Sequence, residues 1–346
     1  MAFSKENIRY TLNGILFVAL FSIAAIQIAQ ISFIKELAIS PLIIGIVIGM
    51  FYANTLRGHL PKEWVPGIVF SAKQLLRLAI VFYGFRITFQ QIMDVGLPGL
   101  TVSTVMLTST ILLGSWVGMK FFKLDRDTAI LTASGSSVCG AAAVLATEPV
   151  LKAEPYKSAI AVGTVVLFGT IAMFLYPVMF KSGILGMDPA TYGIYVGGTV
   201  HEVAQVVAAG GAIGPEASDT AVIVKMTRVM MIAPMLIILG LWISAKARKE
   251  GGEAGGVKLV IPWFAVWFVV MSGINSLNVI PAAIVSGINQ VDTFMLTMAM
   301  TALGMETNAA KFKQAGIKPI LLALVMFVWL IIVGYFVTKG AVALFG

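Results

Sequence analysis

Charged residues are scarce in this chain: Asp, Glu, Lys and Arg make up 12% of its 346 residues, about half of the roughly 25% found in soluble domains. A single cysteine, Cys139, excludes an intrachain disulfide and a thiolate metal cluster. Two histidines, His59 and His201, are too few for a metal site of the usual zinc type. These shortages exclude a disordered protein, a secreted disulfide scaffold and an ordinary cytosolic enzyme.

Apolar residues are correspondingly abundant, at 59% of the chain. A bilayer-spanning helix needs about 20 of them in succession. The sequence therefore predicts an all-α polytopic membrane protein that forms one transmembrane domain over 1–346. About eleven spans are expected, at 12–33, 38–56, 65–88, 97–119, 127–149, 157–180, 190–211, 219–245, 259–277, 281–305 and 319–344.

The distribution of basic residues predicts the orientation of these spans. With the N-terminus in the cytoplasm and the C-terminus outside, 15 of the 24 Lys and Arg residues fall on the cytoplasmic side and 5 outside. This asymmetry follows the positive-inside rule. It also explains most of the net charge of +8 without any binding to nucleic acid.

Two pairs of segments indicate an internal repeat. PLIIGIVIGMFYANTL at 41–56 matches PWFAVWFVVMSGINSL at 262–277, and the glycine spacing of 84–98 recurs at 304–319. The copies lie an odd number of spans apart, so they are expected to run in opposite directions. Inverted repeats are characteristic of secondary transporters. We therefore expect repeat-like halves near 38–180 and 190–344; chance likeness between glycine-rich apolar segments is the alternative.

The expected span 127–149 is interrupted by small and polar residues. The segment ASGSSVCGAAAV at 133–144 contains Ser136, Ser137, Cys139 and Gly140. Small residues suit close helix packing. They also suit a helix that unwinds in mid-membrane and turns free amides and hydroxyls toward a ligand.

Ionisable residues inside the span 190–211 are a second candidate feature. His201, Glu202 and Gln205 lie in GGTVHEVAQVVAAGG, at helical spacing that could place them on one side. Ionisable groups inside a membrane usually mark ion or substrate pathways. These three residues are candidates for carrying a coupling proton; a structural hydrogen-bonded pair is the alternative.

Four basic residues also fall within expected spans. Lys73 and Arg77 are four residues apart, and Lys225 and Arg228 are three apart, so each pair shares a helix face. They could extend to an interface, or one could neutralise Glu202. An anionic ligand would balance their charge, because arginine forks match oxyanions. On that hypothesis, Arg228→Ala abolishes binding in a folded protein.

Several of these segments resemble a known family. KQLLRLAIVFYGFRIT, SGSSVCGAAAV, LFGTIAMFLYP, GGTVHEVAQVVAAGG, VKMTRVMMIAP and MAMTALGMETN, spread over about 38–330, are similar to a bacterial inner-membrane family labelled sulfate exporters. That family is grouped with the cation–proton antiporters and bile-acid–sodium symporters. The resemblance implies inverted repeats, two discontinuous crossing helices with breaks at 134–140 and 197–205, and a location in the bacterial inner membrane.

Together these features predict a secondary transporter of a small anion, sulfate or a related oxyanion or sulfonate, coupled to protons. The expected substrate-binding residues are Ser136, Ser137, Cys139, Gly140, Lys73, Arg77, Lys225 and Arg228, with His201, Glu202 and Gln205 for coupling. No cofactor or metal is expected beyond a coupling H+ or Na+, and no nucleic acid partner is expected. A homodimer is compatible with the sequence. The alternatives are a cation–proton antiporter of the same fold and an intramembrane enzyme using Cys139 and His201.

Overall fold

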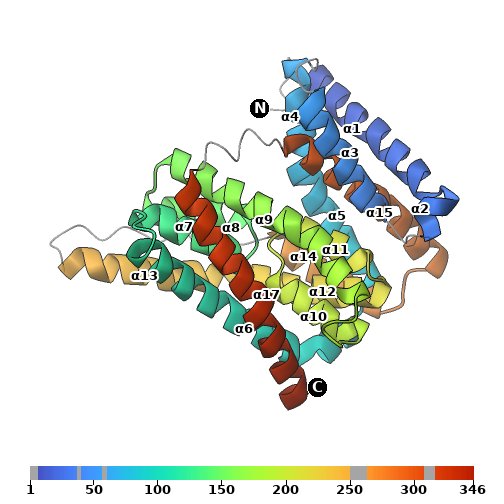
Figure 1. Cartoon of the computed structure of the whole chain (residues 1–346). Coiled ribbons are helices and arrows are strands. Elements are labelled where there is room, and N and C mark those ends of the chain that lie inside the picture. Colours follow the sequence, from blue (N-terminus) through green and yellow to red (C-terminus); the bar gives the residue numbers. More distant parts are fainter. Residues whose placement is uncertain (1–6, 37–39, 57–60, 250–262, 308–315) are drawn as a thin grey trace. The chain divides into compact units, whose positions relative to one another are not determined.

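The computed structural model describes residues 7–36, 40–56, 61–249, 263–307 and 316–346. Every regular element in these ranges is helical (Figure 1). The segment 304–319, one half of the second proposed repeat pair, lies partly outside them. The described chain divides into two compact units that are interleaved in sequence: unit 1 is 1–91 with 264–311, and unit 2 is 92–263 with 312–346.

Six stretches in the described part of the chain are long and apolar enough to cross a bilayer. They are Ile8–Ala29, Lys62–Arg86, Phe89–Lys120, Tyr156–Lys181, Pro215–Ile243 and Ile317–Phe345. Shorter apolar helices occur at Pro41–Thr55, Ala141–Leu151 and Trp263–Ser276. A membrane protein with many apolar helices is thus confirmed, whereas the count of about eleven spans and the inverted repeats stay predictions.

Unit 1 contains α1 (Ile8–Ala29), α2 (Ser32–Glu36), α3 (Pro41–Thr55), α14 (Trp263–Ser276, from Phe264 onward) and α15 (Ala282–Glu306). It also contains a long interrupted helix made of η2 (Lys62–Trp64), α4 (Val65–Phe70), η3 (Ser71–Leu75), α5 (Leu76–Tyr83) and η4 (Gly84–Arg86). The segment η3 is a π-helical turn, and such turns locally widen a helix. Helices α1, α3 and α15 pack side by side (Figure 1).

Glycines allow α3 and α15 to approach closely. A Cβ atom on Gly304 would lie 2.9 Å from the Met50 amide nitrogen and 3.0 Å from the Gly49 Cα atom. Backbone atoms cannot move aside as a side chain can, so only glycine fits there. Close backbone contact between small residues is how helices associate where water supplies no driving force.

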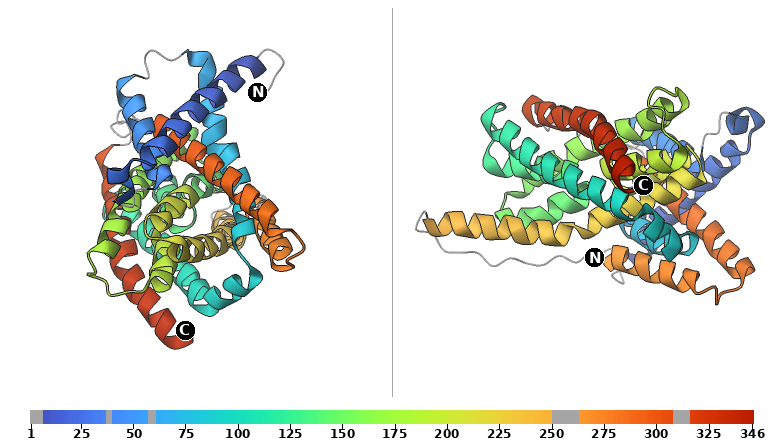
Figure 2. Two further views of the ribbon diagram at one scale, coloured as in Figure 1. Left: turned by 90° about the vertical axis from the view of Figure 1, so that its right-hand side faces the viewer. Right: turned by 90° about the horizontal axis from the view of Figure 1, so that it is seen from below.

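Unit 2 contains α6 (Phe89–Lys120, from Ile92 onward), α7 (Arg126–Ser137), α8 (Ala141–Leu151), α9 (Pro155–Lys181), α10 (Pro189–Thr199) and α11 (Val203–Gly211). It continues with α12 (Pro215–Met230), α13 (Ile232–Lys249) and α17 (Ile317–Phe345). Two further views show these helices from other sides, with the outer part of α13 projecting beyond its neighbours (Figure 2). The expected spans 127–149 and 190–211 each form two short helices, α7 with α8 and α10 with α11.

Buried aromatic residues fix α10 within unit 2. The ring of Tyr176 on α9 stacks on that of Tyr195 at 5.0 Å between centroids. The Tyr176 hydroxyl donates to Thr199 Oγ1 at 2.9 Å, and the Tyr192 hydroxyl donates to the Tyr176 carbonyl at 2.8 Å. Because buried hydroxyls need partners, this network fixes the position of α10 right up to its C-terminal end.

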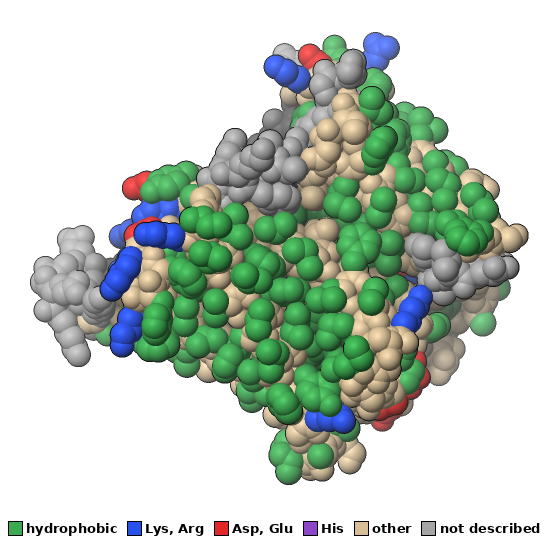
Figure 3. Space-filling model, in the orientation of Figure 1, with side chains coloured by type: hydrophobic (Ala, Val, Ile, Leu, Met, Phe, Trp, Pro, Cys, Tyr) green, Lys and Arg blue, Asp and Glu red, His purple; other side chains and the backbone are tan. Residues whose placement is uncertain are grey.

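The surface is mostly apolar. Hydrophobic side chains cover much of the visible face, and the charged side chains are few (Figure 3). Large exposed residues include Leu16, Trp116, Ile238 and Phe336. In water such a surface would cause aggregation, whereas lipid chains solvate it, which agrees with a membrane location.

Candidate functional site: two interrupted helices in unit 2

The first half of each interrupted helix begins at an aspartate. Asp125 accepts a hydrogen bond from the Thr128 amide at 3.1 Å and caps α7, and Asp188 accepts one from the Thr191 amide at 2.9 Å and caps α10. Partial burial alone would raise the pKa of Asp188, but its hydrogen bonds to Thr191 and to the Asp188 and Ala190 amides together outweigh burial, so the pKa lies below the ordinary 3.8. Both helices therefore start at an ionised cap.

Each first half ends at buried residues in the interior of unit 2. Helix α7 ends at Ser137, and the break continues through Val138 and Cys139 to Gly140, which has φ of 79°. Helix α10 ends at Thr199, and the chain is extended at Val200 and Glu202 before α11 starts. The last carbonyl groups of a helix have no intrahelical partner. Burial makes an external partner necessary.

Arg228 supplies that partner for both helices. From α12, its Nε donates to the Ser137 carbonyl at 2.6 Å and its Nη2 to the Ser136 carbonyl at 3.0 Å. Its Nη1 donates to the Gly198 carbonyl near the end of α10. The side chain is 0% exposed. One guanidinium thus joins the C-terminal ends of two helices, where the helix dipoles favour a cation.

Lys225, one helical turn earlier on α12, binds the two breaks themselves. Its Nζ donates to the Val138 carbonyl at 2.7 Å, the Val200 carbonyl at 2.8 Å and the His201 carbonyl. An ammonium group has three N–H donors, and all three are used. No donor of Lys225 is therefore left for a ligand, and only a protonated lysine can make this set of bonds.

Glu202 lies at the N-terminal ends of α8 and α11, the helices that follow the two breaks. Its Oε1 accepts from the Ala141 amide at the start of α8 at 3.1 Å. The carboxylate also accepts from the Gln205 amide in α11, while the Gln205 side chain accepts from the Glu202 amide at 2.9 Å. This reciprocal pair is a capping box. A single carboxylate thus covers the positive ends of both α8 and α11.

Gly140 makes room for this carboxylate. A Cβ atom there would lie 2.8 Å from Glu202 Oε1 and closer still to Glu202 Cγ. The positive φ of Gly140 is a second reason why a side chain does not fit. The glycine is therefore explained by the Glu202 contact as well as by the helix break.

Several buried polar groups in the same region have no protein partner. Within the described residues, Ser136 Oγ, both ring nitrogens of His201 and Gln205 Nε2 make no hydrogen bond. The three side chains are at most 1% exposed. Leaving buried polar atoms unpaired costs about 1–3 kcal/mol each, so four of them together indicate a place for water or a polar ligand.

The structure brings most of the expected site residues together. Ser136, Ser137, Cys139, Gly140, His201, Glu202, Gln205, Lys225 and Arg228 all lie at the two breaks or bind them. Lys73 and Arg77 lie instead in unit 1, on η3 and α5, with exposed side chains. They are not part of this buried cluster.

Two sequence expectations about geometry differ from the structure. His201 and Glu202 precede the first residue of α11, Val203, so the three coupling residues do not share a helix face. Lys225 and Arg228, which were expected to face an anionic ligand, donate their hydrogen bonds to backbone carbonyls. The spacing Glu202-x-x-Gln205 was a capping-box signal in the sequence, but a helix assumed to be continuous has no cap.

Comparisons with known proteins agree with this architecture. Residues 13–323 match the family described as "Conserved hypothetical protein 698". A "UPF0324 membrane protein" of Bordetella pertussis is 52% identical, with 96% of each chain covered. One of Pseudomonas putida is also 52% identical, over 98% of this chain and 96% of the relative. The "UPF0324 inner membrane protein YeiH" of Escherichia coli K12 is 47% identical over 85% of this chain and 84% of the relative.

The protein is therefore an all-helical membrane protein with several candidate spans. It belongs to the UPF0324 membrane protein family, which is also described as conserved hypothetical protein 698. The Escherichia coli relative is described as an inner membrane protein. These names give no substrate, no coupling ion and no membership of the cation–proton antiporter superfamily, so those parts of the sequence expectation stay proposals.

Proposed function

We propose that this chain is a secondary transporter of a small anion, sulfate or a related oxyanion or sulfonate, coupled to protons and working by alternating access. The observation that carries the proposal is the meeting of two interrupted helices inside one unit. Non-helical backbone at membrane depth is tolerated where protein surrounds it or where it lines a cavity. In transporters, such breaks hold the substrate and the coupling ion.

The charges at the breaks support an anion as substrate. Lys225 and Arg228 contribute two positive charges and Glu202 one negative charge, so with a neutral His201 this cluster has a net charge of one. Protonation of Glu202 would raise that to two. Two positive charges balance a sulfate dianion, and one balances a monoanion. Proton binding and binding of a divalent anion are therefore expected to favour each other.

The two cations act at the site in an indirect way. Their hydrogen bonds hold the C-terminal ends of α7 and α10, and their charge makes the interior favourable for an anion. Direct donors would be the Ser136 hydroxyl, Gln205 Nε2, His201 and the amide of Ala141. Helix N-termini commonly bind oxyanions through such amides.

Glu202 links the proton to the substrate in this proposal. The ionised carboxylate accepts the amides that an oxyanion would use. A neutral carboxyl group is a weaker acceptor, so protonation frees these donors and removes a repulsive charge. The proton then enters and leaves the site with the anion.

Radiolabelled sulfate counterflow into proteoliposomes tests the proposal, with and without an imposed pH gradient. We expect saturable uptake that the gradient drives. Glu202→Gln keeps an oxygen acceptor but cannot titrate, so its uptake should lose the response to the gradient. Glu216→Gln, at an exposed residue of α12, is the matched control. Absence of anion uptake by folded wild-type protein would remove the proposal.

The alternative of the same fold is a cation–proton antiporter in which Glu202 binds the cation. Two buried positive charges beside that carboxylate disfavour a further cation. Cation-stimulated proton movement in vesicles, without any requirement for an anion, would support this alternative over anion transport.

We propose transport rather than catalysis because the enzyme hypothesis requires Cys139 and His201 to act together. Nucleophilic catalysis needs a base within hydrogen-bond reach of the thiol. Neither ring nitrogen of His201 makes such a bond among the described residues. Full activity of a Cys139→Ala variant in transport would exclude Cys139 as a catalytic nucleophile. A cytoplasmic N-terminus, an external C-terminus and a homodimer belong to the same proposal, and terminal reporter tags and the mass of the purified protein would test them.

A further inference from the structure

Unit 1 has an open cavity of about 540 Å³ at the N-terminal end of α15. Polar side chains line most of it: Arg86 from η4, Asn278 from the turn after α14, and Ser286, Asn289 and Gln290 from α15. None of these residues belongs to the interrupted helices of unit 2. Small-molecule sites typically measure about 300–1,000 Å³ and combine an apolar wall with a few fixed polar groups.

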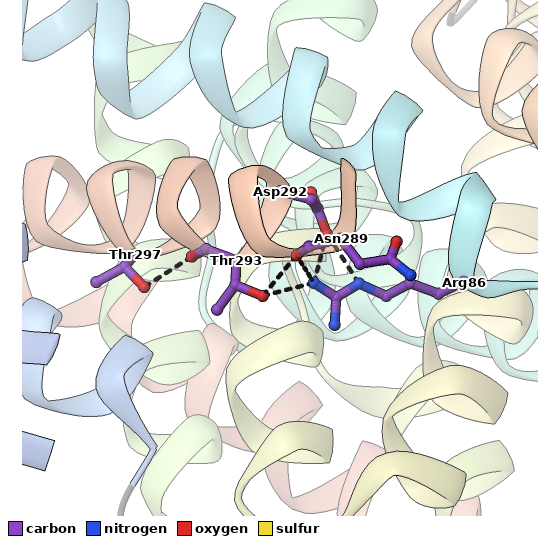
Figure 4. A network of polar contacts seen from close by, with 5 residues as sticks. All are labelled: Arg86, Asn289, Asp292, Thr293 and Thr297. Carbon is purple, nitrogen blue, oxygen red and sulfur yellow. Dashed lines mark hydrogen bonds and ion pairs between the residues drawn. The ribbon is translucent and has the colours of Figure 1, made fainter. Parts of the chain in front are cut away.

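Arg86 is held in place by one side of its guanidinium group (Figure 4). Its Nε and Nη2 both lie 2.9 Å from Asp292 Oδ2. Nη2 also donates to the Asn289 carbonyl at 2.8 Å and to Thr293 Oγ1 at 2.7 Å. The guanidinium carbon lies 5.0 Å from the centre of the Tyr83 ring. The position of the cation is therefore fixed before any ligand arrives.

The opposite side of the same group is available. Among the described residues, Nη1 has no hydrogen-bond partner, and in Figure 4 this terminal nitrogen points away from Asp292 and Thr293. The Arg86 side chain is 28% exposed, whereas Asp292 is 0% exposed and does not line the cavity. Arg86 is thus the one charged side chain among the lining residues.

Helix α15 adds to the positive potential. Ala282 and Val285, in its first turn, line the cavity together with Ser286. The N-terminus of this 25-residue helix carries a partial positive charge. A free guanidinium edge, a helix N-terminus and neutral polar side chains therefore surround the same space. Ile280 and Val285 provide an apolar wall.

We propose that this cavity binds the anionic oxygen head group of an organic molecule, a sulfonate, carboxylate or phosphate, with Arg86 Nη1 as the fixed donor. The volume exceeds what an inorganic oxyanion fills, so the remainder of the molecule lies along Ile280 and Val285. The head group comes from a free organic anion or from an anionic lipid. This binding site is separate from the breaks and does not depend on the function proposed for them.

Equilibrium binding of radiolabelled benzenesulfonate to the purified full chain in phosphatidylcholine nanodiscs tests the proposal. The probe has one oxyanion and an apolar ring of suitable size. Gln290→Glu places a negative charge in the cavity at an exposed position, and we expect its affinity to fall about fivefold to tenfold. Gln90→Glu makes the same chemical change at an exposed residue of unit 1 that does not line the cavity. Its affinity should stay within twofold of wild type.

Arg86→Lys is a second variant, which keeps a cation for Asp292 but loses the planar group that reaches both sides. It should also bind the probe at least fivefold more weakly, while its melting temperature shows whether it is folded. Equal affinity in wild type, Gln290→Glu and Gln90→Glu overturns the proposal, because the probe then binds elsewhere. Adding phosphatidylglycerol to the nanodiscs shows whether the natural head group belongs to a lipid or to a free organic anion. Competition with the probe indicates a lipid head group, and no competition indicates a free organic anion.

Discussion

Arg228 gives the sharpest prediction from the structure. Replacing it with methionine keeps most of the side-chain volume but removes every donor to the Ser136, Ser137 and Gly198 carbonyls. Each buried acceptor left without a partner costs about 1–3 kcal/mol. Relaxation and water entry reduce the sum, so we expect a loss of about 4 kcal/mol. Few single substitutions cost that much.

The measurement is thermal unfolding of the purified variant in detergent. A loss of about 4 kcal/mol corresponds to a melting temperature lower by roughly 8 °C, at about 2 °C per kcal/mol. Lys318→Met removes a cation from an exposed position in the first turn of α17 and should change the melting temperature by less than about 1 °C. Arg228→Lys keeps the charge and fewer donors, and should melt between wild type and Arg228→Met.

The result that would refute this reasoning is a stable Arg228→Met protein that has lost anion binding. That outcome would mean that the guanidinium contacts the ligand, as the sequence alone suggested, and that the helix ends do not need it. A destabilised variant, with the control unchanged, would instead assign Arg228 to the architecture of the site.

Three further predictions concern caps and glycines. Asp188→Ala should cost about 1 kcal/mol at neutral pH; because the folded-state pKa of Asp188 is lowered, the difference from wild type should vanish as the pH falls below 3.8 and through that pKa. Gly304→Ala should destabilise by about 1–3 kcal/mol, while Gly287→Ala, with nothing within 4 Å of its Cβ, should be neutral or stabilising. Gly140→Ala should displace the Glu202 carboxylate and abolish the response of sulfate uptake to a pH gradient.

Each of these predictions has a direct check. Denaturant or thermal unfolding between pH 3 and 7 tests the cap, and a pH-independent difference would contradict it. Melting temperatures of the two alanine variants on α15 test the helix contact, which equal values would disprove. For Gly140, sulfate uptake by Gly211→Ala is the control, since a Cβ atom at Gly211 has nothing within 4 Å. An unchanged response to the pH gradient in Gly140→Ala would show that the role of Glu202 does not depend on this glycine.

The location of the candidate site could be predicted from residues that are rarely found inside membrane-spanning segments. Lys225, Arg228 and Glu202 are charges within apolar segments, and small polar residues from Ser136 to Gly140 interrupt another. Such features are expensive in a membrane, so each one marked the region that the structure places at the breaks. The all-helical fold followed from apolar length alone.

The roles of these residues could not be predicted, because they depend on which backbone groups are left without partners. Hydropathy does not show where a helix stops in mid-membrane, and the carbonyls that bind Lys225 exist only because α7 and α10 end there. Asp292 is a further example. It is the single acidic residue in the expected span 281–305, but no sequence pattern pairs it with Arg86, which lies 206 positions away.

The six hydrogen bonds from Lys225 and Arg228 to the ends of α7 and α10 and to the breaks that follow restrict how these helices can move. Lys225 and Arg228 are one turn apart on one helix, and each holds backbone from both interrupted helices. The separation between the ends of α7 and α10 is therefore fixed by the length of two side chains. A conformational change that exposes the site to alternate sides must carry both ends and α12 as one rigid body, since pulling them apart would break buried bonds on both cations at once. If the proposed transport takes place, a pair of distance probes on α7 and α10 should report the same separation in every state of its cycle.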